Sequence, residues 1–88
     1  MNVFKNSWDL EIVAHGGLGV TRFDGFRQKL GISRKVLSER LKGLIDAEIL
    51  ERQKYQSAPE RYEYLLTDKG RDLLPIHAAI TNWRERWG

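Results

Sequence analysis

The sequence predicts an α+β fold that is mostly α, and three observations carry this prediction. Apolar residues recur at spacings of three and four along residues 23–30 and 33–47, as on helices with one buried side. Residues 49–66 change to strand-like segments around a turn. Most of the positive charge lies within residues 22–42. Two short helices followed by a hairpin form a winged helix-turn-helix, in which one helix enters a DNA major groove beside the hairpin.

Length and composition set bounds on the class of protein. The 88 residues are expected to form one domain, residues 1–88, with a modest core. A core shared with a second copy would add stability. The chain has no cysteine, which excludes disulfides, thiolate metal sites and cysteine-based redox sensing. No apolar run approaches the roughly 18 residues of a membrane span, and residues 1–6 lack the apolar core of a signal peptide, so we expect a cytoplasmic protein.

The net charge of +3 is unevenly distributed. Residues 1–21 and 43–88 each carry a charge of −1, whereas residues 22–42 carry +5. Against Asp24 and Glu39, this central segment has seven basic residues: Arg22, Arg27, Lys29, Arg34, Lys35, Arg40 and Lys42. Its position on the expected helix-turn-helix suits a phosphate-binding surface. The solvated face of ordinary surface helices would have a similar composition, and that alternative stays open.

The first expected helix begins at Asn6 or Ser7 as its cap. It ends in the glycine cluster at residues 16–19 and carries Trp8, Leu10, Ile12 and Val13. The cluster lacks the lysine and hydroxyl residue of a phosphate-binding loop, so it is interpreted as a turn. Residues 20–21 are expected to form a minimal strand.

The second helix is expected to begin at Phe23 or Asp24 and to end at Leu30. It buries a stripe of Phe23, Phe26 and Leu30. Gly31 supplies the left-handed residue that ends this helix, Ile32 anchors the turn, and Ser33 caps the next helix.

The third helix, residues 33–47, has two distinct sides. Its buried side is expected to contain Leu37, Leu41, Leu44, Ile45 and the aliphatic stem of Glu48. Its opposite side presents Lys35, Ser38, Glu39, Lys42 and Asp46, with Arg34 near the amino end, where recognition helices commonly contact bases.

The wing is expected over residues 49–66, as strands 49–55 and 61–66 around a turn at 56–60. Tyr62 and Tyr64 share one strand face with Leu66. Core packing is therefore favoured over base stacking for these two tyrosines.

The terminal helix is expected over residues 67–87, with Thr67 as its cap and Asp68 in the first turn. Pro75 should kink it after its first two turns. An apolar stripe then recurs along the helix: Leu73, Ile76, Ile80, Trp83 and Trp87. This stripe exceeds what so small a domain easily covers, so we expect a two-fold dimer interface. Packing of the stripe wholly on its own domain remains the alternative.

Several sequence segments together resemble the HxlR-type winged-helix transcriptional regulators. The similarity spans nearly the whole chain, and its more specific segments are residues 30–41, 49–52, 61–64 and 66–73, followed by Pro75. The resemblance implies a homodimeric DNA-binding regulator whose third helix enters the major groove while the wing contacts backbone or minor groove. Many members sense redox through an amino-terminal cysteine, which this chain lacks. Members often have an additional helix where only a short segment precedes Trp8 here, which bears on dimer geometry.

The candidate DNA-contacting residues follow from this arrangement. The expected base-reading residues share the exposed side of the third helix: Arg34, Lys35, Ser38 and Lys42. Glu39 faces the same way and either accepts a hydrogen bond from cytosine or is a solvated charge. The expected contacts to the DNA backbone come from the helix-turn-helix and the wing: Arg22, Arg27, Ser33, Lys54 and Arg61.

The leading hypothesis is a sequence-specific double-stranded DNA-binding regulator, a homodimeric repressor acting at an inverted-repeat operator. The alternative of a different class is a winged-helix module for protein–protein interaction without specific DNA binding. A non-specific chromatin-type binder is disfavoured by the low total charge. No catalytic residues, cofactor or metal site are expected, because His15 and His77 are not at metal-binding spacing. The sequence leaves open the operator, the direction of regulation and any small-molecule effector.

Overall fold

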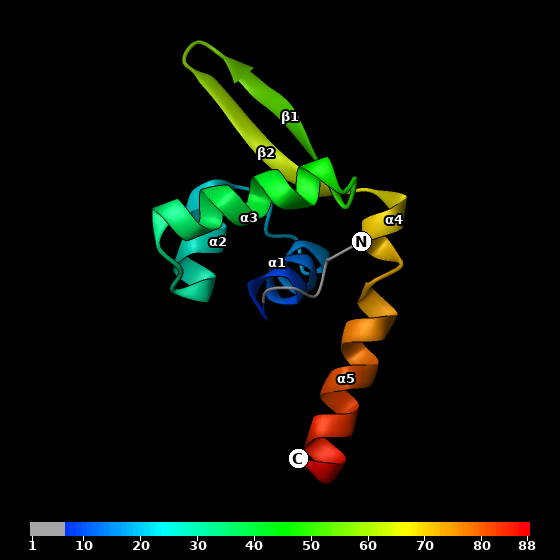
Figure 1. The fold of residues 1–88 in the computed structure, drawn as a ribbon. Coiled ribbons are helices and arrows are strands. Elements are labelled where there is room, and N and C mark those ends of the chain that lie inside the picture. The colour runs from blue at the N-terminus through cyan, green and yellow to red at the C-terminus, as the bar shows by residue number, and fades with distance from the viewer. Residues whose placement is uncertain (1–6) are drawn as a thin grey trace.

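The structure, a computed structural model, describes residues 7–88. Figure 1 shows α1 at the centre of the molecule, α3 lying across it, a hairpin projecting beyond α3, and α5 leading away in the opposite direction. The principal extents are 49 × 26 × 22 Å. The elements in order are α1 (Ser7–Gly17), α2 (Phe23–Leu30), α3 (Arg34–Asp46), β1 (Leu50–Ser57), β2 (Glu60–Leu66), α4 (Asp68–Arg71) and α5 (Leu74–Trp87). The predicted winged helix-turn-helix, mostly α with a two-stranded wing, is confirmed.

The core forms where α1, α2 and α3 meet the base of the wing. Its buried side chains come from these elements, from the segments between them and from the segment between α4 and α5: Ile12, Val13, Phe26, Ile32, Leu37, Leu41, Leu44, Ile49, Leu50 and Leu73. Burial of apolar side chains of this size contributes about 1.5–3 kcal/mol each before the entropy cost of folding is counted. The core therefore fixes α3 with one side inward and the other toward solvent.

The glycine cluster at residues 16–19 overlaps the end of α1 and does more than end the helix. Gly16 and Gly17 lie within α1, and only Gly19, with φ of +99°, has left-handed geometry. A methyl group on Gly17 would come within 2.7 Å of Leu74, so this glycine permits close approach of α5 to α1. The cap expected at Asn6 lies outside the described residues.

The strand expected at residues 20–21 does not form. The sheet has two strands only within residues 7–88, and the segment that follows α1 makes a single backbone hydrogen bond to it. In that bond the Tyr64 N–H donates to the Thr21 carbonyl at 2.6 Å. One bond without a ladder is too little for a third strand.

The helix-turn-helix follows the prediction closely. Gly31 has φ of +65°, and its N–H donates to the Arg27 carbonyl, which ends α2. Ser33 caps α3 by accepting a hydrogen bond from the Val36 N–H at 3.2 Å. Ile32, 4% exposed, anchors the turn between the two helices. Local capping chemistry thus sets the angle at which α3 leaves α2.

The expectation for Glu48 was wrong. The residue lies beyond α3, has φ of +62° and is exposed, so its stem does not line the core. The chain turns here into β1, and residues that follow β2 stabilise this turn through two hydrogen bonds. The Thr67 hydroxyl donates to the Glu48 carbonyl at 2.6 Å, and Lys69 Nζ donates to the Ala47 carbonyl at 2.8 Å.

The two strands of the wing are each longer than expected, and the turn between them is shorter. β1 pairs antiparallel with β2 from Leu50↔Leu66 to Ser57↔Glu60, leaving Ala58 and Pro59 at the tip with a cis bond between them. The register shifts between Lys54 and Gln56. The predicted alternation is not seen in burial, because β1 is exposed after Leu50 while β2 is half-buried from Tyr62 to Leu66.

The expected terminal helix is divided into two. Thr67 caps α4 by accepting a hydrogen bond from the Gly70 N–H at 3.0 Å, as predicted. The helix is interrupted at residues 72–73, before Pro75, and Pro75 then lies in the first turn of α5. A proline ring clashes with the carbonyl four residues earlier, so the helix is interrupted just before Pro75. None of the helices in residues 7–88 combines the length and apolarity that crossing a membrane requires.

Candidate nucleic-acid interface

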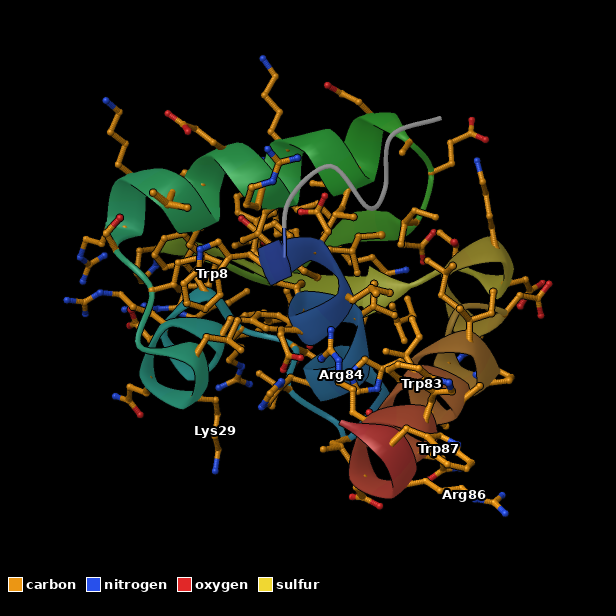
Figure 2. All side chains as sticks on the ribbon, turned by 60° about the horizontal axis from the view of Figure 1, so that its bottom comes forward. Trp8, Lys29, Trp83, Arg84, Arg86 and Trp87 are labelled. Atoms are coloured by element: carbon orange, nitrogen blue, oxygen red, sulfur yellow. The ribbon has the colours of Figure 1, made fainter. Side chains whose placement is uncertain are left out.

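The four residues expected to read bases lie together on the exposed side of α3. Burial of Leu37, Leu41 and Leu44 fixes the rotation of the helix about its axis. Each candidate base reader is therefore exposed: Arg34, Lys35, Ser38 and Lys42. Figure 2 shows the side chains of α3 extending away from the helices packed beneath it. The arrangement presents positive and hydroxyl groups on one convex surface, which suits a major groove.

Two acidic residues, Glu39 and Asp46, share the exposed side of α3. Within the described residues, only Arg34 and Lys54 among the cationic candidates have a carboxylate partner. Arg34 lies 3.7 Å from Asp24, with both side chains well exposed. Exposed pairs of this kind contribute little, so Asp24 leaves Arg34 able to contact another anion.

One basic residue of the central segment points inward. Arg40 reaches from α3 to Asp9 of α1, with Nε 2.8 Å from Oδ1 and Nη2 3.3 Å from Oδ2. Asp9 is 1% exposed. Burial raises the pKa of the Asp9 carboxyl, while the hydrogen bond and the charge of Arg40 oppose that increase. Arg40 therefore fastens α3 to α1 instead of adding to the exposed positive surface, which the sequence analysis did not foresee.

The predicted backbone contacts of the helix-turn-helix lie at its edges. Arg22 precedes α2, and its guanidinium lies 4.3 Å from the centre of the Tyr55 ring on the wing. Arg27 and Ser33 are exposed, on α2 and at the cap of α3. The Arg22 contact joins the start of α2 to β1, so this arginine is placed to orient the wing as well as to meet a phosphate.

The predicted wing contacts differ in their surroundings. Lys54 pairs with Glu60 at 3.3 Å, and the Tyr62 hydroxyl donates to the same carboxylate at 3.0 Å. Arg61, which follows Glu60 on β2, is exposed. Tyr64 packs on the core as expected, but Tyr62 does not belong to it, because the guanidinium of Arg52 covers its ring at 4.3 Å.

Arg52 is the site residue that the sequence analysis missed. It lines a groove between α3 and the wing, together with Phe23, Ser38, Leu41, Lys42, Ile45 and Tyr64. The sequence contained one indication of this role. Arg52 lies two residues from the candidate Lys54 on the same strand, and alternate residues of a strand face the same side. The groove thus joins two candidate residues of α3 to an arginine of β1.

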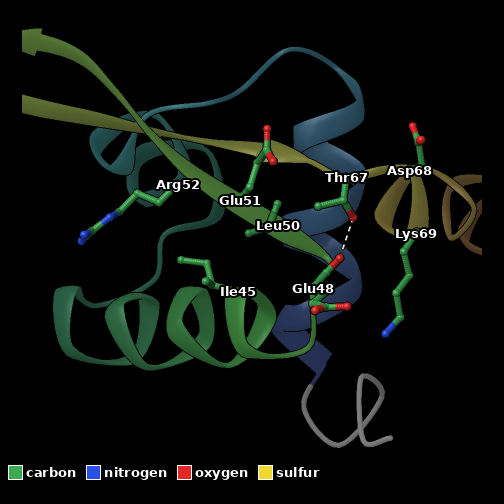
Figure 3. Close-up of a pocket in the computed structure, with 8 residues that line it drawn as sticks. All are labelled: Ile45, Glu48, Leu50, Glu51, Arg52, Thr67, Asp68 and Lys69. Carbon is green, nitrogen blue, oxygen red and sulfur yellow. Dashed lines mark hydrogen bonds between the residues drawn. The ribbon is translucent and has the colours of Figure 1, made fainter.

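A second hollow lies at the far end of α3. Figure 3 shows it bounded by the end of α3, the start of β1 and the start of α4. Its lining mixes both signs of charge: Ile45, Glu48, Leu50, Glu51, Arg52, Thr67, Asp68 and Lys69. Three carboxylates make this hollow less suited to a DNA phosphate than the groove between α3 and the wing.

The apolar stripe of the terminal helix is largely uncovered. Ile76, Trp83 and Trp87 are 45%, 62% and 69% exposed, and Ile80 is partly buried. Figure 2 shows Trp83 and Trp87 beside each other at the outer end of α5. Leu73 differs from its predicted role, because it precedes α5 and is buried in the core of its own chain.

The two histidines make structural contacts within the chain. His15 Nδ1 lies 2.8 Å from the Glu11 carbonyl, and His77 Nε2 lies 3.6 Å from Oε1 of the same glutamate. The second contact ties α5 to α1. In the described part of the chain, no three His, Cys, Asp or Glu residues gather in a way that could hold a metal ion.

A capped helix-turn-helix, a wing and an outward polar side on the second of the two helices define the winged-helix class of transcriptional regulators. The chain belongs to the HxlR-like helix-turn-helix family, which it matches over residues 3–88. The resemblance drawn from the sequence is confirmed.

Curated relatives are named as transcriptional regulators. The chain is 39% identical over 80 residues to the HTH-type transcriptional regulator Rv3095 of Mycobacterium tuberculosis, covering 91% of this chain and 51% of that protein. It is 36% identical over 88 residues to the HTH-type transcriptional regulator YvaP of Bacillus subtilis, covering 99% of this chain and 82% of that protein. The chain thus spans about half the length of some of its relatives.

Solved structures share the fold. The redox regulator HypR in its oxidized form is 31% identical, with a TM-score of 0.85 over 97% of this chain and 89% of HypR. Diamide-treated YodB from B. subtilis is 31% identical, with a TM-score of 0.80 over 97% of this chain and 85% of YodB. These likenesses extend over both the helix-turn-helix and the terminal helices.

Proposed function

We propose that this chain is a homodimeric repressor that binds a specific inverted-repeat operator in double-stranded DNA and acts in the cytoplasm. In this proposal residues 1–88 act as one domain, and α3 reads the major groove while the wing contacts the flanking backbone or minor groove. The protein has no catalytic role and needs no cofactor. Its family consists of transcriptional regulators, and DNA binding is implied by the fold.

The observation that carries the proposal is the outward side of α3. The core holds this helix so that Arg34, Lys35 and Ser38 are exposed to solvent, with Lys42 one turn beyond Ser38. Arginine and lysine can donate to guanine acceptors, and serine can contact either type of base. The wing projects beside this helix, as DNA binding by a winged helix requires (Figure 1).

The exposed stripe of α5 supports the dimer. Two tryptophans and Ile76 leave a large apolar surface in contact with water, and such surfaces mark interaction sites. A second copy of the same helix is a suitable partner, because a two-fold interface pairs one patch with itself. A dimer would also present two copies of α3 to the two halves of an inverted repeat.

Selection of bound fragments from sheared genomic DNA, followed by sequencing, tests the proposed function. We expect enrichment of an inverted repeat whose half-sites lie about one helical turn, roughly 34 Å, apart. A variant with Lys35→Ala and Ser38→Ala should lose this enrichment. Lys29→Ala should keep it, because Figure 2 shows Lys29 pointing away from α3. Recovery of no sequence above input would contradict specific DNA binding.

A protein–protein module without specific DNA binding is the competing function, and the salt dependence of binding separates the two. Contacts to phosphates make log affinity fall linearly with log salt concentration, whereas burial of apolar surface does not. We expect the steep salt dependence.

A further inference from the structure

The groove between α3 and the wing has a composition suited to an anion. Among its lining residues are two cations, Lys42 and Arg52, and the hydroxyl of Ser38. The rest of the lining is apolar or aromatic: Phe23, Leu41, Ile45 and Tyr64. No carboxylate belongs to the lining, in contrast with the hollow at the other end of α3. Two positive charges above an apolar floor interact with an anion more strongly than they would in open water.

Arg52 is held in position without being neutralised. Its guanidinium lies over the Tyr62 ring at 4.3 Å, and across residues 7–88 it forms no ion pair. Figure 3 shows Arg52 leaving β1 on the side opposite to Glu51, toward the side on which α3 lies. Stacking on an aromatic ring uses the face of the guanidinium and leaves its N–H edge able to donate. That edge can bind a phosphate through two parallel hydrogen bonds.

We propose that this groove binds one phosphate group of the DNA backbone, with Arg52 and Lys42 as its cationic ligands and Ser38 as a further donor. The inference rests on the proposed function and assigns a contact beyond those expected from the sequence. It also changes the expected roles of Lys42 and Ser38 from reading bases to holding the backbone. Tyr62 is a positioning residue, because it orients Arg52 and does not itself reach the phosphate.

A phosphate contact has a signature that a base contact lacks. It contributes at every sequence, so its loss lowers affinity uniformly and reduces the slope of log affinity against log salt by about one. A base contact contributes at one position of the operator, so its loss relaxes preference there. The two roles for Arg52 therefore predict different results from the same variant.

The test measures the affinity of purified variants for the selected operator and for an unrelated duplex over a range of salt concentrations. Arg52→Ala should weaken binding to both duplexes by roughly tenfold and reduce the salt slope by about one. Arg52→Lys should restore the slope but only part of the affinity, because lysine keeps the charge and loses the planar pair of donors. Lys29→Ala removes the same charge from a distant surface and should change both quantities little.

The role of Tyr62 is tested by a double-mutant cycle. Tyr62→Phe keeps the ring beneath Arg52 and removes only the hydroxyl that donates to Glu60, so it should retain most of the affinity that Tyr62→Ala loses. Tyr62→Ala should weaken binding, but adding it to Arg52→Ala should cause no further loss, since both changes remove the same contact. Circular dichroism of each variant checks that the wing and helices remain folded.

Three outcomes would overturn the inference, and they can be told apart. If the unmodified protein binds specifically but Arg52→Ala has the same affinity and salt slope as Lys29→Ala, the groove contact alone is refuted. A changed base preference in Arg52→Ala would make Arg52 a base reader and refute the phosphate assignment. Absence of DNA binding by the unmodified protein would refute the proposed function together with this inference.

Discussion

At the scale of single residues, the structure distinguishes two kinds of basic side chain in residues 22–42. Some form contacts in the interior, and others face solvent. Arg40 lies between Ser38 and Lys42 in the chain, yet its partner is the buried Asp9 of α1. Ser38 and Lys42 face solvent because each lies two residues, about 200°, from Arg40 around the helix. Local charge counted along a sequence therefore overstates the charge available to DNA.

Removal of Arg40 should destabilise the fold, because it leaves the Asp9 carboxylate buried without a partner. We expect Arg40→Met to lower the free energy of unfolding by about 3 kcal/mol, measured by urea denaturation. The double change Asp9→Asn with Arg40→Met should recover part of the loss. Arg27→Met, at an exposed position, should change stability by less than about 0.5 kcal/mol. Equal stability of Arg40→Met and Arg27→Met would contradict a structural role for the Arg40–Asp9 pair.

The pH dependence of Arg40→Met follows from the same carboxyl. Burial already raises the pKa of Asp9, and loss of the guanidinium removes the contribution that opposes the increase. The folded state then binds a proton more tightly than the unfolded state, so stability falls as pH rises from the ordinary aspartate pKa through the raised one. We expect Arg40→Met to regain stability on acidification from neutral pH relative to the unmodified protein. A parallel pH profile of the two proteins would argue against burial as the cause.

Lys35 provides the test of a base contact at residue scale. If Lys35 reads a base, Lys35→Ala should cost roughly 1–3 kcal/mol of binding free energy at the operator and less at an unrelated duplex. The comparison is made with Lys29→Ala, and an unchanged operator affinity would remove Lys35 from the set of base readers. The thermal unfolding of both variants should match that of the unmodified protein, because both side chains are exposed.

At the scale of elements, the helix-turn-helix is the part that sequence predicted best, and local chemistry explains why. Gly31 and Ser33 determine the end of α2 and the start of α3 through hydrogen bonds to residues three or four positions away. The strand expected at residues 20–21 and the stem of Glu48 depended on contacts with distant segments, whereas the helix break follows locally from Pro75. The groove residue Arg52 was missed because its groove neighbours on α3 lie 7 to 14 residues earlier in the sequence.

The junction of α4 with the wing depends on a close backbone approach. A methyl group on Gly70 would meet the carbonyl oxygen of Ile49, and the backbone at the base of the wing cannot move away as a flexible side chain would. We expect Gly70→Ala to lower the free energy of unfolding by about 2 kcal/mol or more, within the range of overpacking. Gly43→Ala meets only Nη2 of Arg40, at 3.1 Å, and gains helix propensity, so it should cost clearly less than Gly70→Ala. Thermal unfolding of Gly70→Ala and Gly43→Ala measures their difference in stability. Similar losses of stability in both variants would contradict this explanation.

At the scale of the whole molecule, the proposed DNA surface and the exposed stripe of α5 lie on different parts of the chain. The wing and α5 project from the core in opposite directions (Figure 1). Contacts between copies through α5 would therefore leave α3 and the groove accessible. The stripe itself was evident from sequence, whereas the burial of Leu73 depended on the break between α4 and α5.

Association through α5 can be measured directly. We expect the unmodified chain to sediment as a dimer at micromolar concentration, and Trp83→Ala with Trp87→Ala to sediment as a monomer. Leu18→Ala removes an apolar side chain that is 82% exposed and stands apart from the stripe, so it should leave the dimer intact. A monomer of the unmodified chain at this concentration would rule out the proposed dimer.

The interruption at residues 72–73 places a joint between the body of the molecule and its outermost helix. A helix of 14 residues is about 21 Å long. A rotation of about 10° at its base would move Trp87 by roughly 4 Å, a distance comparable to one base-pair step. In a dimer joined through α5, the angle at this joint would determine the distance between the two copies of α3. Pro75 and the His77–Glu11 contact lie beside the joint, so in such a dimer changes at either would be expected to alter the operator spacing that the two copies can span.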